Sequence, residues 1–147
     1  MTFSKTDSAG YLANHMARIF ARDLTARIKP LGLTTGSFPA LLELWEQDGL
    51  TQTQLTRRLD IEQATMANTL ARMERDGLVT RKKDETDGRV QRIWLTPHGK
   101  SLHGPATRAA AAVNATALDS LSPAEHERLI ALMQKIIATA QARATPD

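Results

Sequence analysis

Residues 51–96 decide the fold of this chain, and they read TQTQLTRRLDIEQATMANTLARMERDGLVTRKKDETDGRVQRIWLT. Thr51 and Gln54 have the spacing of a capping box, in which each side chain binds the other residue's free backbone N–H at the start of a helix. We therefore expect a first helix over residues 51–59. A tight turn and a second helix over residues 63–76 follow it.

Two strands are predicted after the second helix. Gly77 is the residue best able to take the left-handed conformation beyond a helix end, so the helix stops there. Residues 78–83 have strand character, residues 84–88 favour a turn, and residues 89–95 alternate polar and apolar side chains as a half-buried strand does. This order is that of a winged helix-turn-helix, and it predicts a mainly α fold with a small β-wing (α+β).

The composition fits a globular protein and excludes several kinds of site. The chain has 147 residues, 41% of them hydrophobic, which is enough for one domain with a real core. Only 4% are aromatic, which argues against a stacking surface for single-stranded nucleic acid. The absence of cysteine excludes disulfides, thiolate metal sites and cysteine nucleophiles, and it is compatible with a reducing cytoplasm. We find no signal peptide and no apolar run long enough for a membrane, so we expect a cytoplasmic protein without a membrane partner.

The positive charge is confined to the predicted wing segment. Residues 51–100 contain ten Lys and Arg against seven Asp and Glu, a local charge of +3, whereas the rest of the chain contains nine of each. A neutral body that carries one basic module is typical of a protein that binds a polyanion.

Further helices are predicted on both sides of this module. Apolar residues recur at helical spacing over residues 11–29, and a shorter helix begins near Phe38. Thr96 and Pro97 start a long alanine-rich helix over residues 97–120, and a last helix covers residues 123–144.

The length of the alanine-rich helix suggests a dimer. A helix of about 24 residues is roughly 36 Å long, too long to bury itself on a module of this size. We expect a single domain over residues 1–147, with a DNA-binding module at 31–96 and a helical homodimerisation region formed by residues 10–30 and 97–145. An intramolecular bundle of three helices is the alternative.

Three segments resemble the MarR family of transcription regulators, and its SlyA branch in particular. They are DGRVQRIWLT at residues 87–96, IEQAT at 61–65 and MERDGLV at 73–79. The resemblance implies an obligate dimer that reads the major groove of DNA with the helix at 63–76 and the minor groove with the wing. It also implies, in many members, a small acidic or phenolic ligand that weakens DNA binding. Gly88 departs from the pattern, because SlyA-like wings often have a second Arg before Arg89.

The second helix of the motif has a core face and an opposite face. The 100° helical step brings Met66, Leu70 and Met73 into one narrow apolar stripe. The other side carries small residues, one amide and arginines, which suit a major groove because Asn pairs with adenine and Arg with guanine or phosphate. An ordinary solvated helix face is the alternative. The predicted DNA-binding residues are Thr51, Gln52, Thr53, Gln63, Ala64, Thr65, Asn68, Arg72 and Arg89.

The ends of the motif have their own predicted roles. Thr51, Gln52 and Thr53 start the first helix, where amides and hydroxyls can hold a phosphate, although simple capping is equally compatible for Thr51. Arg89 is predicted to enter the minor groove, since a narrow groove concentrates negative potential. The resemblance implies that Asp87 and Arg92 brace the wing loop, and offsets of two and five residues across the turn allow Asp87 to pair with Arg89 or Arg92.

The sequence gives no support for an enzyme, a cofactor or a metal site. The four histidines lie in different segments without a second ligand at helical spacing, and phosphate-loop and serine-elbow motifs are absent. A possible pocket for a small aromatic or phenolic acid is formed by Tyr11, His15, Arg18, Phe38 and Trp45. A network at the dimer interface is the alternative role for the first three of these residues.

We therefore predict a homodimeric regulator of transcription that binds double-stranded DNA at a pseudo-palindromic operator and acts as a ligand-responsive repressor. The alternative from another class is a dimeric protein-interaction module with a winged-helix fold and no specific DNA binding. Salt-dependent binding to a duplex separates the two.

Overall fold

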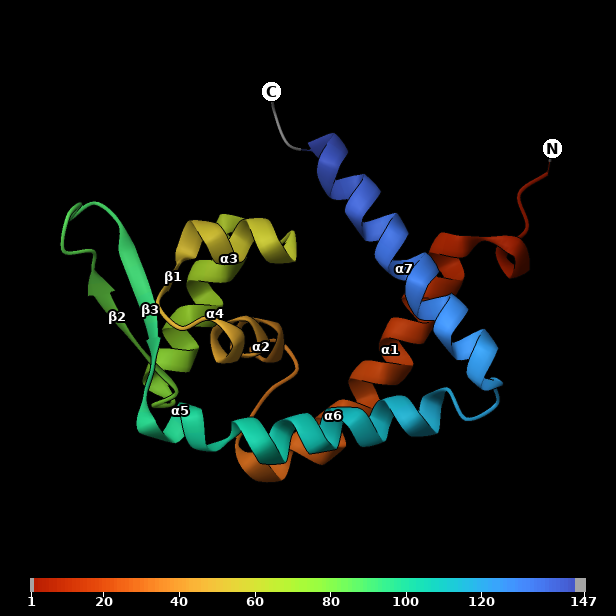
Figure 1. Ribbon diagram of the computed structural model, residues 1–147, viewed down its shortest axis with the longest axis horizontal. Helices are drawn as coiled ribbons and strands as arrows, with labels where there is room; N and C mark the ends of the chain where they lie inside the picture. The colour runs from red at the N-terminus through yellow and green to blue at the C-terminus, as the bar shows by residue number, and fades with distance from the viewer. Residues whose placement is uncertain (1, 145–147) are drawn as a thin grey trace. The chain divides into compact units, whose positions relative to one another are not determined.

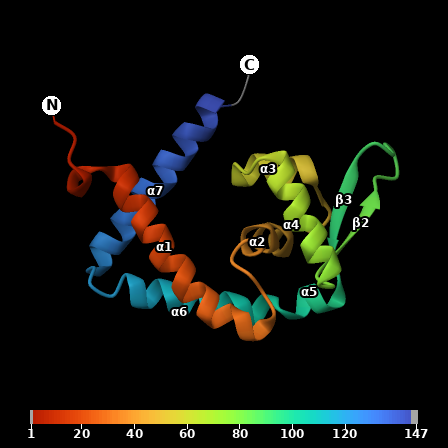
Figure 2. The ribbon, with the colours of Figure 1, turned by 180° about the vertical axis from the view of Figure 1, so that it is seen from behind.

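The computed structural model describes residues 2–144 (Figures 1 and 2). The chain divides into two compact units, residues 1–111 and 112–147. The expected dimerisation region ended at residue 145, which lies outside the described residues. In chain order the elements of the first unit are η1 (Lys5–Asp7), α1 (Ala9–Ile28), η2 (Lys29–Leu31), α2 (Phe38–Glu46), β1 (Leu50–Thr51), α3 (Gln52–Leu59), α4 (Gln63–Arg75), β2 (Val79–Lys83), β3 (Gln91–Leu95), α5 (Pro97–Ser101) and the start of α6 (His103–Ala117).

The two helices of the helix-turn-helix agree with the predicted bounds to within one residue at each end. Gln54 donates its backbone N–H to Thr51 Oγ1 at 3.0 Å, and Thr51 N–H binds Gln54 Oε1 at 2.9 Å, so the capping box at the start of α3 is confirmed. Asp60 takes the left-handed conformation, with φ 53°, and makes the turn toward α4. Gly77 ends α4 with φ +75°, and Leu78 N–H binds Met73 O across it at 2.9 Å.

The sheet has three antiparallel strands in the order β1-β3-β2, one more than predicted. The additional strand β1 is only two residues long, and Leu50 pairs with Ile93 of β3. Asp48 explains why so short a strand forms, because its carboxylate accepts the backbone N–H of Leu95 at 2.9 Å and of Gly49 at 3.1 Å. Gly49 has φ +76° and lies against the ring of Trp94, where no side chain would fit.

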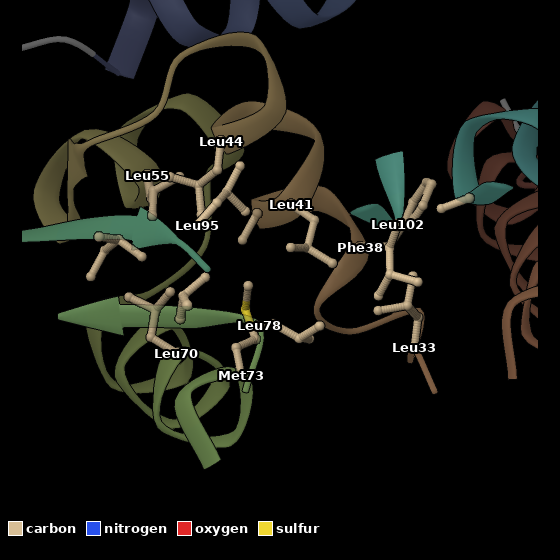
Figure 3. Packing of buried hydrophobic residues seen from close by; sticks show 14 of the residues in the cluster. Leu33, Phe38, Leu41, Leu44, Leu55, Leu70, Met73, Leu78, Leu95 and Leu102 are labelled. Carbon is tan, nitrogen blue, oxygen red and sulfur yellow. The ribbon is translucent and has the colours of Figure 1, made fainter. Parts of the chain in front are cut away.

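The core of the first unit lies between the sheet and the helices of the motif (Figure 3). Met66, Leu70 and Met73 of α4 are at most 1% exposed, so the predicted core stripe is confirmed. Leu41 and Leu44 of α2 pack into the same cluster and are equally buried. Burial of about ten such side chains, each worth roughly 1.5–3 kcal/mol, fixes the orientation of α4. The face of α4 opposite this stripe is therefore directed away from the core.

The prediction of one continuous helix over residues 97–120 was wrong. The structure has α5 and α6 in its place, separated at Leu102, which is buried. Pro105 is the physical reason, because it has no N–H to bind the carbonyl of Ser101 and its ring would clash with that carbonyl in a continuous helix. Pro105 instead lies in the first turn of α6, where the missing N–H costs nothing.

The second unit contains the end of α6 and the helix α7 (Pro123–Ala144). A second capping box starts α7, with Glu125 N–H bound to Ser122 Oγ at 3.1 Å and Ser122 N–H to Glu125 Oε1 at 2.9 Å. On the outer surface of α7, Ile136 and Ile137 are 67% and 55% exposed. Within residues 2–144, none of the helices has the length and apolar character needed to cross a membrane.

Candidate nucleic-acid interface

The face of α4 that the core stripe leaves free is exposed. It carries the predicted contacts Ala64, Thr65, Asn68 and Arg72, and the predicted contact Gln63 is the first residue of the helix; none of these five side chains is buried. Among the residues that the structure describes, the side chains of Asn68 and Arg72 have no hydrogen-bond or ion-pair partner in the same chain. Their donors and acceptors are therefore available to a ligand. Arg75, nearer the helix end, lies 3.5 Å from the carboxylate of Asp76.

The start of α3, the start of α4 and residues 89–91 at the end of the wing loop enclose a hollow of about 300 Å³. It is lined by Thr51, Gln52, Thr53, Gln63, Arg89, Val90 and Gln91. The structure thus brings five of the nine predicted DNA-binding residues around one concave surface. Within it the hydroxyl of Thr51 accepts the backbone N–H of Gln54, so this side chain serves as a helix cap.

Two glutamines join the starts of the two helices. Gln52 Nε2 donates to Gln63 Oε1 at 3.1 Å, and Gln63 Nε2 donates to the hydroxyl of Thr56 at 3.4 Å. Thr56 is only 7% exposed, and its hydroxyl donates to Thr53 O at 2.7 Å. These hydrogen bonds join the two helices, because they connect the buried hydroxyl of Thr56 in α3 to Gln63, the first residue of α4.

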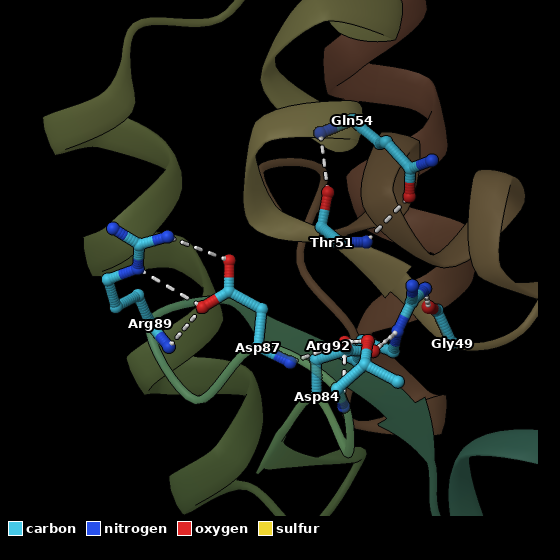
Figure 4. A network of polar contacts seen from close by, with 8 residues as sticks. Gly49, Thr51, Gln54, Asp84, Asp87, Arg89 and Arg92 are labelled. Atoms are coloured by element: carbon cyan, nitrogen blue, oxygen red, sulfur yellow. Dashed lines mark hydrogen bonds and ion pairs between the residues drawn. The ribbon is translucent and has the colours of Figure 1, made fainter.

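The wing loop is organised by Asp84, which sequence reasoning missed (Figure 4). Its Oδ2 accepts the Thr86 hydroxyl at 2.6 Å and the backbone N–H groups of Thr86 and Asp87 at 3.2 and 3.1 Å. Its Oδ1 accepts Arg92 Nε at 2.6 Å. Aspartate side chains in turns commonly bind the backbone N–H two residues on, so an aspartate at the start of the turn-rich segment 84–88 was a signal present in the sequence.

Arg92 fixes the wing, but its partner differs from the one that the spacing allowed. The ion pair between Asp87 and Arg92, which the five-residue offset allowed, does not form. Arg92 instead binds Asp84 and donates from Nη1 to Gly49 O at 2.9 Å. The geometric reason is the hairpin register, in which Lys83 pairs with Gln91 and brings the start of the loop beside Arg92. Arg92 therefore ties β3 to the loop on one side and to the turn before β1 on the other.

Asp87 forms an ion pair with Arg89, which is the other partner that the sequence spacing allowed. Its Oδ1 accepts both the backbone N–H and Nε of Arg89, at 3.1 and 3.2 Å, and its Oδ2 lies 3.4 Å from Nη2 (Figure 4). The Arg89 side chain is 91% exposed in spite of this pair. The wing thus presents a guanidinium to solvent in a defined orientation.

The two wing carboxylates are held ionised. Hydrogen bonds from Thr86 and Arg92 keep the pKa of Asp84 far below its ordinary value of 3.8. The guanidinium and backbone N–H of Arg89 likewise lower the pKa of Asp87. At neutral pH both loop contacts are therefore formed by charged partners.

The remaining cations of the motif differ in how free they are. Arg58 is bound to α2, with Nη2 2.8 Å from Gln47 Oε1 and Nη1 3.4 Å from Glu43 Oε2. Arg81 lies 3.9 Å from Glu74 of α4, and its backbone N–H points at the same carboxylate. Arg57 is exposed and has no partner within residues 2–144.

Four of the five residues predicted for a small-molecule pocket form two aromatic pairs. Tyr11 and His15 of α1 are exposed, with ring centroids 6.4 Å apart in an edge-on arrangement. Phe38 is buried and meets Trp45 edge-on at 6.0 Å. Trp45 also stacks on His103 at 5.1 Å and donates from Nε1 to Gly99 O at 3.0 Å. Phe38 and Trp45 therefore have packing roles in the first unit, and Arg18 is exposed.

Metal binding has no support in the described part of the chain, where no group of three His, Asp or Glu side chains could hold an ion. The chemistry that the site offers is hydrogen bonding and electrostatic attraction. These groups are amides, hydroxyls and guanidinium groups, and they lie on one exposed helix, around one concave hollow and on a wing braced by ion pairs.

Comparison with known proteins identifies the family. The model of the MarR family matches residues 33–90. The transcriptional regulator HosA of Escherichia coli O157:H7 is 32% identical over 107 residues, which are 73% of this chain and 79% of that protein. The organic hydroperoxide resistance transcriptional regulator of Bacillus subtilis (strain 168) is 38% identical over 86 residues, 56% of this chain, and the match spans only 58% of its length.

A solved structure shows the same fold. A MarR family transcriptional regulator from Listeria monocytogenes, complexed with 26mer DNA, superposes with a TM-score of 0.83 at 23% identity, covering 97% of this chain and 92% of that one. The exposed helix, the braced wing and these similarities lead to one assignment: the chain belongs to the MarR family of transcription regulators.

Proposed function

We propose that this protein is a homodimeric, sequence-specific regulator that binds double-stranded DNA and represses transcription from a pseudo-palindromic operator. The observation that carries the proposal is the exposed face of α4, where Asn68 and Arg72 have no partner in the described chain. The similarity to a family member complexed with DNA supports it. Membership of the SlyA-like branch, which the segment at residues 73–79 resembles, is part of the proposal.

Each element has a role in the proposed complex. Asn68 and Arg72 of α4 read base edges in the major groove, and the small side chains of Ala64 and Thr65 let the helix approach closely. Thr53 and the start of α3 bind phosphate, which sets the register without reading sequence. Arg89, held by Asp87 at the tip of the wing, enters the adjacent minor groove.

Apolar side chains exposed on two helices support a dimer. Leu12 and Met16 of α1 are 44% and 37% exposed, and Ile136 of α7 is 67% exposed. Such surfaces on a water-exposed helix mark interaction sites. We assign residues 10–30 and 97–145 to the dimerisation region and residues 31–96 to the DNA-binding module of one domain.

The symmetry of the dimer predicts the shape of its operator. A two-fold dimer presents its two recognition helices to successive major grooves on one face of a duplex. The half-site centres should therefore lie about 10–10.5 base pairs, roughly 34 Å, apart. We therefore expect the operator to be a pseudo-palindrome whose two half-sites have that spacing.

A small aromatic or phenolic acid is proposed as the effector. Arg18 of α1 is exposed without a partner among the described residues and can bind a carboxylate, while Tyr11 and His15 beside it offer aromatic edges. Phe38 and Trp45 complete the proposed set, with the packing roles described above. The effector acts by changing the spacing of the two wings.

Selection from a library of random duplexes, followed by a salt titration, tests the proposed function. We expect enrichment of one pseudo-palindromic sequence. A protein that neutralises Z phosphates should lose affinity with a log–log slope near −0.9Z, so raising the salt must weaken binding steeply. A failure to enrich any sequence, together with a flat salt dependence, would favour a protein-interaction module instead.

A further inference from the structure

The buried hydroxyl of Thr56 starts a chain of hydrogen bonds whose direction can be deduced. Thr56 is 7% exposed, and its hydroxyl donates to the backbone carbonyl of Thr53 at 2.7 Å. A carbonyl oxygen can only accept, and a hydroxyl has one hydrogen, so that hydrogen is committed. Thr56 Oγ1 can therefore only accept from its other neighbour, the carboxamide of Gln63.

This constraint fixes which way the Gln63 amide points. The NH₂ group must face Thr56, as it does with Nε2 at 3.4 Å from Thr56 Oγ1. The reverse orientation would set two acceptor oxygens against each other, which is the criterion by which amide orientations are assigned. Oε1 of Gln63 then points at Gln52, which donates from Nε2 at 3.1 Å. The amide is thus held at both ends by α3.

Two groups of the Gln63 amide remain free for a ligand. A carboxamide has two N–H hydrogens and two oxygen lone pairs, and the contacts with Thr56 and Gln52 use one of each. One donor and one acceptor are left on the exposed first residue of α4, at the end of a recognition helix that reaches base edges.

We infer that Gln63 reads adenine in the major groove, with Thr56 and Gln52 as the residues that position its amide. Adenine offers an N7 acceptor and an N6 donor, the complement of one N–H and one carbonyl oxygen. Guanine offers two acceptors, N7 and O6, so the fixed carbonyl oxygen of Gln63 would face O6. The inference rests on the proposed function, because it names the base read by one residue of the same interface.

The test compares base preferences obtained by selection from random duplexes for the full-length wild type and four variants. Gln63→Ala should lose the preference for adenine at one position of each half-site, with affinity for the selected duplex about 5- to 150-fold lower. Thr56→Val keeps the shape of the side chain and removes the hydroxyl, and it should weaken the preference for adenine at that same position. Thr56→Ser retains the hydroxyl and should keep the wild-type preference for adenine. Gln52→Ala should relax the same position as Thr56→Val.

Modified duplexes provide the second arm. Replacing that adenine with 7-deazaadenine removes N7, and replacing it with purine removes the N6 amino group. Each change should weaken wild type and leave the affinity of Gln63→Ala unchanged. Thermal unfolding of each variant shows that a loss of preference is not a loss of fold.

The outcomes distinguish this inference from the proposed function. Enrichment of one operator by wild type, with the same base preferences in Gln63→Ala, overturns the inference and leaves the proposed function standing. If Gln63→Ala relaxes the adenine position and Thr56→Val does not, the positioning by Thr56 is overturned. If wild type enriches no sequence, the proposed function fails and the inference fails with it.

Discussion

Asp84 and Arg92 join the loop of the wing to its returning strand, with Asp84 Oδ1 2.6 Å from Arg92 Nε. Because Arg92 also donates to Gly49 O at 2.9 Å, the same side chain reaches the turn before β1. The opposite oxygen of Asp84 closes the loop through Thr86. The carboxylate of Asp84 therefore braces the loop from which Arg89, itself paired with Asp87, is presented to solvent.

Replacing Asp84 with Asn should loosen the wing without unfolding the protein. The variant keeps the size of the side chain but loses the charge that Arg92 and the loop N–H groups bind, so these hydrogen bonds weaken. We expect lower backbone order parameters over residues 84–90 in ¹⁵N relaxation, an unchanged core, and weaker binding to DNA. Glu85→Gln is the matched control, since Glu85 is an exposed neighbour without a partner in residues 2–144. Equal order parameters in both variants would contradict the role of Asp84.

The wing should resist acid until the pH falls well below ordinary carboxyl values. The folded-state pKa of Asp84 is lowered from 3.8, so its contribution to stability is fully present above 3.8 and is lost only as the pH falls through the lower folded value. The same sign applies to Asp87. We expect the carboxyl ¹³C shift of Asp84 to titrate at lower pH in the folded protein than in the urea-unfolded chain. A coincident titration of Asp84 in the two states would show that the loop contacts do not form in solution.

The helix-turn-helix could be predicted from sequence because its determinants are local. Capping at Thr51, the stop at Gly77 and the stripe through Met66 each follow from residues within one or two turns, and all three are confirmed. The break at Leu102 was also encoded locally, by Pro105, and was missed because the helical start at Thr96 dominated the interpretation.

Other features could not be read from local spacing. Strand β1 depends on Asp48 accepting the N–H of Leu95, a residue 47 positions away. The partner of Arg92 depends on the hairpin register, which no single offset reveals. The series of hydrogen bonds from Thr56 through Gln63 to Gln52 depends on how α3 and α4 pack against each other. Such contacts are tertiary, so only the folded arrangement of the elements identifies them.

On α4, Asn68→Ala and Arg72→Ala should each cost about 1–3 kcal/mol of binding free energy on the selected operator and relax base preference at the positions that we expect them to contact. Both side chains are exposed and lack partners within the described chain, so their loss should leave unfolding unchanged. Fluorescence anisotropy on the operator and on single-base variants measures the effect. Arg75→Ala removes the same charge from the end of the helix, where Arg75 lies beside Asp76, and is the matched control.

Arg57→Ala should behave differently from either groove variant. Arg57 is an exposed α3 cation without a described partner, and we predict that it binds a phosphate of the DNA backbone. Its loss should weaken binding to all duplexes alike and reduce the magnitude of the salt slope by about 1.

If Asn68→Ala and Arg72→Ala both retained wild-type affinity for the operator, the assignment of the exposed face of α4 to DNA binding would be wrong.

Introducing a charge on α7 should separate the subunits. Ile136 is 67% exposed in one chain, and we expect the partner subunit to cover it, so Ile136→Glu places an unpaired carboxylate in that interface. Analytical ultracentrifugation should give a dimer for wild type at micromolar concentration and a monomer for the variant, with a parallel loss of operator binding. Gln134→Glu adds the same charge on another side of the exposed helix and should remain dimeric. A wild-type monomer at this concentration would favour the intramolecular bundle.

Salicylate should weaken the complex with the operator, and Arg18 should be required for the effect. An effector can shift the spacing of the wings only in proportion to its difference in affinity for the two states, and a typical coupling of 1–3 kcal/mol lowers operator affinity roughly 5- to 150-fold. The guanidinium of Arg18, exposed on α1, supplies the charge that a carboxylate seeks. Titrating salicylate into the complex should release DNA from wild type and leave the Arg18→Ala complex intact. Arg27→Ala is the control, because Arg27 is also exposed on α1 and nine residues of helix place it on the opposite side from Arg18. Equal release from wild type and Arg18→Ala would place the effector elsewhere, whereas no response to any aromatic carboxylate would mean that the abundance of the protein alone sets the occupancy of its operator.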